Sequence, residues 1–466
     1  MQGFAVSSIE SLQIMKPLDP ASFVAQHHLF RSQLTQLLDL SHPLVRLAKA
    51  LNWSGFEKRF GALYVENIGR PGLPTRLMVG LHYLKYAFDE SDESVVERWV
   101  ENPYWQFLCG EEYFQHVFPL DPSSLTRWRD RVGPAGIESL LAETIATAKR
   151  MGALTASSLK RVNVDTTVQE KAVAFPTDAR LYHKARATLV REAKQRGVRL
   201  RQSYARVGKV ALIRQGRYAH ARKPALAKKA TRQLRTVLGR VIRDVERKIP
   251  SPDESMKVLL ARAQRIHAQQ RDDKNKVYSM HAPEVECVAK GKAHQKYEFG
   301  VKVAVVSTSR DNWVLAADAV PGNPYDGHTL AGALAQAERI GGVAPTEAYV
   351  DQGYRGAARS VPLVAVHPPK QGRGLPRSER RWLKRRSAIE PVIGHLKSDC
   401  RLDRNHLKGT QGDRINAMLA GAGLNFRKLL RAFLRAFLGR LATALFTAIA
   451  RSPRFASLQP AALQAA

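Results

Sequence analysis

The chain has 466 residues, with 74 lysines and arginines against 41 aspartates and glutamates, which gives a formal net charge of +33. Its length allows two or three domains with proper cores, and its 44% apolar content fits a globular protein. So large a positive charge makes a polyanion the expected partner, and favours nucleic acid over a membrane surface.

The cysteine pattern and the apolar stretches exclude several other classes. No CxxC spacing occurs among the three cysteines, so neither a zinc knuckle nor a disulfide framework is indicated, which suits a reducing cytoplasm. The first twenty residues lack the basic and apolar regions of a signal peptide. The most apolar stretch, residues 429–450, contains three arginines, so we expect no membrane span.

Residues 1–155 are predicted to form a helical, DNA-binding domain. Between residues 74 and 152 apolar residues recur at helical steps, and turn-rich breaks at 70–72 and 133–134 divide the region into short helices.

Within this region, residues 121–131 read as a capped helix carrying three arginines. One interpretation is a helix-turn-helix-like unit that contacts DNA, and the other is an ordinary amphipathic helix with solvated arginines. We favour the first interpretation, which makes DNA contacts of Arg127, Arg129 and Arg131.

The first candidate catalytic residue is Asp165. It follows an apolar β-branched run that starts near Arg161, so we expect it to end a strand. An aspartate in such a place is usually a turn former or a helix cap. Its functional interpretation therefore depends on further acids elsewhere in the chain.

Residues 183–274 are predicted to be a basic helical insertion that interrupts the core. Between residues 181 and 250 there are 21 lysines and arginines but only three acids, which is more than half of the net charge. Apolar residues line one side only, so we expect the outer face to bind DNA phosphates, through Arg232, Arg235 and Arg240 among others. The alternative is a pair of solvated, charged helices without a partner.

Strand patterns return after the insertion. Residues 297–306 alternate polar and apolar side chains, and residues 313–320 are the expected hairpin partner. Asp326 is read as the signal for a helix start, and His328 as a partly buried group. Residues 347–351 and 361–367 are expected to be two parallel strands.

The second and third candidate acids follow. Asp351 ends the strand at 347–351, and Glu390 lies in a helix that begins after Pro376. Helical spacing places Arg386, Glu390 and Lys397 on one face, although Pro391 must kink or restart the helix. We expect Arg386 and Lys397 to hold DNA phosphates there. Three acids that converge from two strand ends and a helix would form a divalent-metal site.

These residues resemble the catalytic motifs of the DDE transposases of bacterial insertion sequences, in the retroviral integrase superfamily. The third-acid motif of that family is tyrosine, two residues, arginine, three residues, glutamate, six residues, lysine. Arg386, Glu390 and Lys397 match it in type and spacing, whereas Leu383, beside Trp382, stands at the tyrosine position. The resemblance runs from about residue 60 to about residue 425.

The resemblance implies an α/β fold, an RNase H-like mixed sheet with flanking helices, interrupted by the basic insertion and preceded by an all-α domain. The core would comprise residues 156–182 and 275–410, and residues 411–466 a C-terminal helical segment. Asp165, Asp351 and Glu390 would be both catalytic residues and ligands of two Mg²⁺ ions, with Mn²⁺ as a substitute.

The implied function is a transposase that binds the ends of its insertion sequence, cleaves DNA and joins the 3′-ends to target DNA. Double-stranded DNA is the expected partner, a homodimer the expected form on DNA, and the nucleoid in the cytoplasm the expected location. The alternatives are a metal-dependent nuclease or resolvase that does not join strands, and a catalytically inactive DNA-binding derivative.

Overall fold

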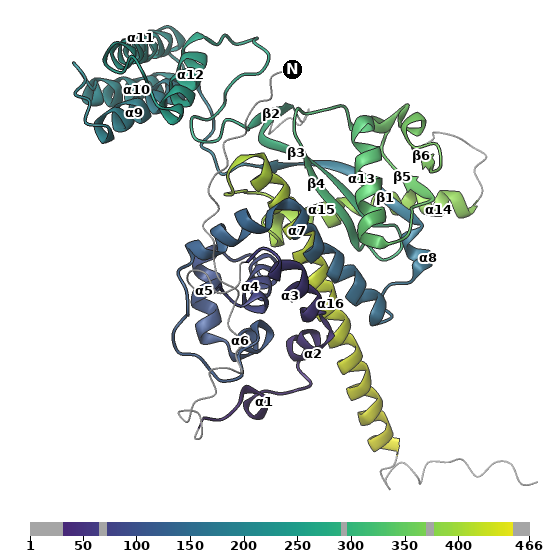
Figure 1. Ribbon diagram of the computed structural model, residues 1–466. Coiled ribbons are helices and arrows are strands. Elements are labelled where there is room, and N and C mark those ends of the chain that lie inside the picture. The colour runs from purple at the N-terminus through teal and green to yellow at the C-terminus, as the bar shows by residue number, and fades with distance from the viewer. Residues whose placement is uncertain (1–30, 65–71, 290–295, 370–376, 451–466) are drawn as a thin grey trace, which may run out of the picture.

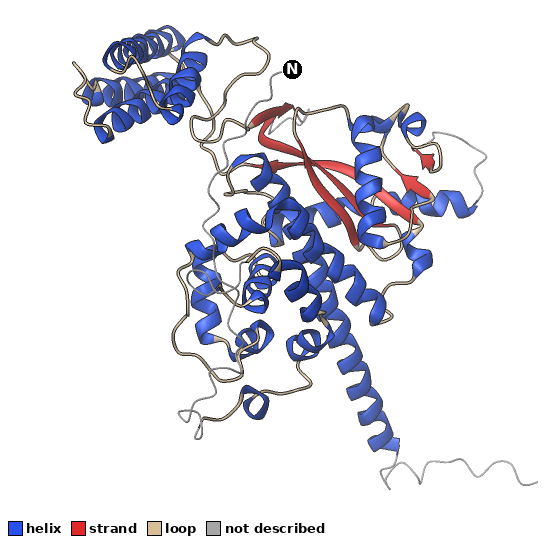
Figure 2. Cartoon of the chain, in the orientation of Figure 1, coloured by secondary structure: helices blue, strands red, loops and turns tan. Residues whose placement is uncertain are grey.

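The computed structural model describes residues 31–64, 72–289, 296–369 and 377–450 (Figure 1). The outer parts of the predicted first and last domains, and most of the predicted break at 70–72, lie outside these ranges. The chain forms a helical N-terminal region and a mixed sheet, and a separate helical body interrupts the sheet in the sequence (Figure 2).

The N-terminal region is helical, as predicted. Helix α4 is its centre, because nearly all of its side chains are buried. Gly133, with a φ of 63°, and Pro134 bend α7 at the predicted break instead of ending it. The helices are α1 Leu34–Leu37, α2 Pro43–Ala50, α3 Trp53–Gly61, α4 Thr75–Ala87, α5 Asp92–Glu101, α6 Pro103–Cys109, α7 Ser123–Arg150 and α8 Ala156–Leu159.

The sheet is built around β3. This strand pairs antiparallel with β1, β2 and β4, whereas β1 also pairs in parallel with β5, and β5 with β6. At Gly300 a side chain is impossible, since a Cβ would lie 1.9 Å from the Gln169 carbonyl oxygen on β1. The strands are β1 Arg161–Glu170, β2 Glu286–Ala289, β3 Tyr297–Thr308, β4 Val314–Val320, β5 Glu347–Tyr349 and β6 Ala365–His367.

The predicted β3–β4 hairpin and the parallel β5–β6 pair are confirmed. The last strand is shorter than predicted, because residues 357–364 form a 3₁₀ turn and a loop instead. Helix α13, Asp326–Gly341, begins at Asp326, as its sequence signal indicated.

The long helix α16, Gly409–Ala450, joins the N-terminal helices to the sheet (Figure 1). Its fully buried Asn425 donates hydrogen bonds to Thr144 on α7 at 3.0 Å and to the Val314 carbonyl on β4 at 2.8 Å. Because both acceptors are buried, losing the amide would leave them unsatisfied. No helix in the described part of the chain is long and apolar enough to cross a membrane.

A separate helical body lies between β1 and β2 in the sequence and stands apart from the sheet in space (Figure 1). It has its own apolar core, which includes Leu189, Leu238 and Ile266. The chain leaves and re-enters the sheet beside Lys171, whose ammonium is buried between Glu284 at 2.9 Å and Asp413 at 2.7 Å. The helices are α9 Asp178–Gln195, α10 Ala205–His220, α11 Pro224–Lys248 and α12 Glu254–Ala268.

Candidate active site

Asp165 lies in the middle of β1, so the prediction that it ends a strand is wrong. Pairing with the long strand β3 continues through Glu170, which carries β1 five residues past Asp165. Its Oδ1 accepts the Thr166 amide at 2.8 Å, and its Oδ2 accepts Arg386 Nη2 at 3.2 Å. Burial raises the pKa of Asp165 to about 6; Asp351 and Asp326 add to the rise, whereas the Thr166 amide and Arg386 oppose it.

The register between β1 and β5 places Asp351 level with Asp165. Asn163 on β1 pairs with Tyr349 on β5, and each catalytic candidate lies two residues further along its own chain. Asp351 caps the 3₁₀ turn Gln352–Tyr354 (η3) and accepts the Gly353 amide at 2.8 Å. Two adjacent parallel chain segments therefore present their aspartates next to each other.

Glu390 reaches the site from a helix restart. Helix α14, Arg377–Arg386, ends two residues before α15, Ile389–Asp399, so the break precedes Glu390. Pro391 falls in the first turn of α15, where a missing amide hydrogen costs nothing. Arg386 Nη1 lies 4.0 Å from Glu390 Oε1, so this one guanidinium pairs with both Asp165 and Glu390.

A fourth carboxylate, Asp326, lies beside this group, although its sequence context indicated only a helix start. Its Oδ1 accepts Lys302 Nζ and Thr166 Oγ1, both at 2.9 Å. A Cβ on Gly353 would lie 2.9 Å from Asp326 Oδ2 and 3.0 Å from Asp351 Oδ1, so both carboxylates flank this glycine. The available signal was Lys302, a largely buried cation on β3 that requires an acidic partner.

The donor type fits a hard divalent cation, because the acids in this region offer carboxylate oxygens. Among the described residues, however, no three acidic, histidine or cysteine side chains are gathered closely enough to hold an ion. Arg386 instead neutralises part of the negative charge. The assembled metal site of Asp165, Asp351 and Glu390 stays a prediction.

The other predicted DNA contacts differ in their surroundings. Arg127 and Arg232 are exposed, whereas Arg131 lies over the Tyr64 ring and Arg240 over the Tyr204 ring. Arg235 donates to the His267 carbonyl at 2.9 Å and so links α11 to the end of α12. Lys397 is half-buried on α15, seven residues beyond Glu390. Contact with DNA stays a prediction for these residues.

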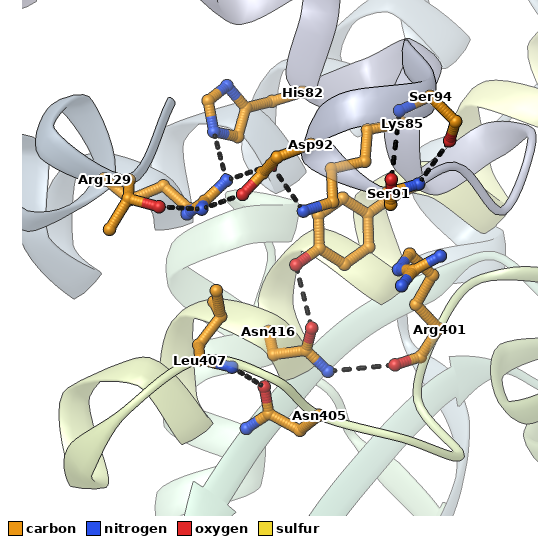
Figure 3. A network of polar contacts seen from close by, with 12 residues as sticks. His82, Lys85, Ser91, Asp92, Ser94, Arg129, Arg401, Asn405, Leu407 and Asn416 are labelled. Carbon is orange, nitrogen blue, oxygen red and sulfur yellow. Dashed lines mark hydrogen bonds and ion pairs between the residues drawn. The ribbon is translucent and has the colours of Figure 1, made fainter. Parts of the chain in front are cut away.

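The prediction that Arg129 contacts DNA is wrong, because its side chain is 1% exposed and faces inward (Figure 3). Its two terminal nitrogens donate to both oxygens of Asp92, at 2.9 and 2.6 Å, and Lys85 donates to the same carboxylate at 2.6 Å. Burial is the main cause that lowers the pKa of His82 to about 3, and the charge of Arg129 is the second. His82, which lies beside Arg129, therefore stays neutral. A guanidinium held in this way cannot reach a DNA phosphate.

We expect Arg129→Ala to lower the free energy of unfolding by about 3 kcal/mol, since removing one partner of a buried ion pair leaves uncompensated charge behind. Arg127→Ala, roughly half a helical turn away on the exposed side, should change it by less than about 0.5 kcal/mol. Urea unfolding measures both. Unchanged stability with a loss of DNA affinity in Arg129→Ala would contradict the buried assignment.

The raised pKa of Asp165 predicts a pH-dependent stability in EDTA. The folded protein binds the Asp165 proton more tightly than the unfolded chain, so this contribution to stability is full at low pH and is lost as pH rises through about 6. The shift corresponds to roughly 3 kcal/mol. Asp165→Asn should therefore have a higher melting temperature than the wild type at pH 7, and the difference should be smaller at pH 5. Asp272→Asn, at an exposed position, should show no such difference. Parallel melting curves of Asp165→Asn and wild type would refute this.

Two regions of the chain match known transposase families. Residues 32–131 match the family described as Transposase domain (DUF772), and residues 263–426 match the family described as Transposase DDE domain. A protein of Rhizobium meliloti, described as uncharacterized protein ORF8 in nfe locus, is 54% identical over 208 residues, which are 45% of this chain and 99% of that protein. No solved structure matches the chain significantly.

The two matched regions together define a transposase, a class whose members bind DNA. The chain belongs to the DDE transposases of insertion sequences.

Proposed function

We propose that this transposase binds the ends of its insertion sequence, cleaves the DNA there and joins the 3′-ends to target DNA. The observation that carries the proposal is the register that sets Asp165 beside Asp351, with Arg386 linking Asp165 to Glu390. The order β3-β1-β5-β6, with β1 antiparallel to β3 and parallel to β5, supports an RNase H-like core interrupted by the helical body.

Asp165, Asp351 and Glu390 would hold the metal, with Mg²⁺ the expected ion and Mn²⁺ a substitute. When bound, two such ions supply charge neutralisation at the phosphate and activation of the attacking oxygen. Asp326 is held through Oδ1 by Lys302 and Thr166, so it keeps the neighbouring backbone in place and adds negative charge.

Arg386 and Lys397 are proposed to bind phosphates near the scissile bond. Arg386 Nε is buried and has no acceptor among the described residues, so a donor remains for an incoming oxygen. Asp165 would hold the cation in place of this ion pair, and the Arg386 guanidinium would then be available to the DNA. Lys397, two turns beyond Glu390 on α15, contributes a point charge further along the backbone.

The rest of the chain would hold the DNA. Arg127 and Arg131 on α7 are proposed to contact the element ends, and the basic faces of α9–α12 the phosphate backbone. Two ends must be brought together for joining, so we propose a homodimer on DNA, at the nucleoid in the cytoplasm. The domain limits proposed are 1–155, 156–182 with 275–410, 183–274 and 411–466.

The test is an assay with Mg²⁺, a labelled duplex that carries the element end, and a plasmid target. Cleaved ends and end–plasmid products covalently joined at a 3′-end are expected. Cleavage without joining would make the protein a nuclease or resolvase. Binding without either product would make it an inactive derivative.

A further inference from the structure

Tyr354 carries a buried hydroxyl that the site described above does not use. The residue ends η3, three positions after Asp351, and its side chain is 2% exposed. Its hydroxyl finds no hydrogen-bond partner among the described residues. Most buried polar groups in folded proteins are bonded, so an orphaned hydroxyl beside a catalytic motif requires an explanation.

The surroundings of this hydroxyl are acidic. Burial, and then the negative charges of Asp165, Asp326 and Asp351, raise the pKa of Tyr354 well above its usual value. The hydroxyl therefore keeps its proton and is a hydrogen donor. Thr329 is the polar neighbour of the hydroxyl and moderates this rise, but no atom of the described residues reaches hydrogen-bonding geometry with the tyrosine oxygen.

The preceding residue brings the acceptors close. Asp326 Oδ2 and Asp351 Oδ1 both lie within about 3 Å of the position where a Gly353 Cβ would stand, one peptide unit from Tyr354. Lys302 and Thr166 both donate to Asp326 Oδ1, which leaves Oδ2 on the Gly353 side. The charges of Asp165, Asp326 and Asp351 all act on the Tyr354 hydroxyl, so these carboxylates are the acidic acceptors in its surroundings.

We propose that Tyr354 is a positioning residue of a divalent-cation site, whose hydroxyl donates to one of the three aspartates when a cation draws them together. The bond would fix the orientation of that carboxylate, and it would give the buried hydroxyl an acceptor. Groups that orient metal ligands in this way change metal affinity by about 10- to 100-fold when they are removed. The inference rests on the proposed metal-dependent function.

The test is Tyr354→Phe, which removes the hydroxyl and keeps the ring. Mn²⁺ binding to the full chain, followed by the paramagnetic resonance signal of free Mn²⁺, should weaken about tenfold. The melting temperature in EDTA should stay the same or rise, because the variant lacks a buried donor without an acceptor. The control is Tyr325→Phe, which removes a half-exposed hydroxyl that donates to the Arg355 carbonyl at 3.3 Å; it should bind Mn²⁺ as the wild type does.

Either of two results would overturn this inference and leave the proposed function standing. One is equal Mn²⁺ affinity in Tyr354→Phe and wild type. The other is a lower melting temperature in EDTA with no change in affinity, which would make the hydroxyl a structural group only. A wild-type chain that binds no Mn²⁺ would overturn the inference together with the proposed metal chemistry, so the two failures are distinguishable.

Discussion

Alanine at Asp165, Asp351 or Glu390, one position at a time, is expected to reduce DNA cleavage by a factor on the order of 10³ or more. Each change removes a carboxylate that would hold a cation worth several kcal/mol of transition-state stabilisation. Binding of element-end DNA should be nearly unchanged, since the phosphates keep their cationic partners. Cleavage of a labelled duplex with Mg²⁺ and gel-shift binding of the same duplex measure the two effects.

Glu338→Ala is the matched control for this series. Glu338 is an exposed acid on α13, away from the carboxylates around Gly353, and its loss should leave cleavage intact. A variant of Asp165, Asp351 or Glu390 that retains substantial cleavage would remove that residue from the site. Loss of DNA binding in the same variant would point to a folding role instead.

Replacing Lys228, Lys229 and Arg232 by glutamine should weaken binding to element and non-element DNA alike. All three are exposed on α11, whereas Arg235 is bonded to the His267 carbonyl and is unsuitable for the test. Each phosphate that the variant no longer neutralises should lower the slope of log K against log salt by about 0.9, so up to about 2.7 in total. The measurement is the affinity for both DNAs across a salt series.

The control for the glutamine variant preserves charge and changes shape. Lys228→Arg, Lys229→Arg and Arg232→Lys together should leave the salt slope unchanged, because counterion release depends on charge. Loss of affinity for the element end alone in the glutamine variant would mean that the helical body recognises sequence. No effect on either DNA would mean that these cations do not contact DNA.

Periodicity predicted the positions of the strands well where the strands were long or alternated with helices. The alternation at 297–306 and the apolar run at 313–320 did form a hairpin, because each pattern matched a buried face. It failed at Asp165, because a polar residue in mid-strand looks like a strand end when its ion-pair partner, Arg386, lies 221 residues away. Local patterns carry no information about such partners.

Sequence patterns proposed the three candidate acids but not their surroundings. Asp351 was proposed from the apolar run before it and Glu390 from its motif, whereas Asp326 lies beside Asp351 only through tertiary packing around Gly353. Arg129 was misassigned for the same reason, since helical spacing alone does not reveal that Asp92 on α5 faces it. A charged residue in an amphipathic segment can be placed only when the opposite element is known.

The ion pair between Lys171 and Glu284 joins the two ends of the helical body, so the body could be removed as one unit. The ion pair holds the entering and leaving chain segments together, although β3 lies between β1 and β2, so a short linker could bridge the gap that α9–α12 now span. The body keeps its own apolar core, and the sheet would lose no covering layer by its excision. A shortened chain of this kind would separate the catalytic chemistry from most of the positive charge, and α9–α12 could be grafted onto another sheet whose chain segments lie equally close.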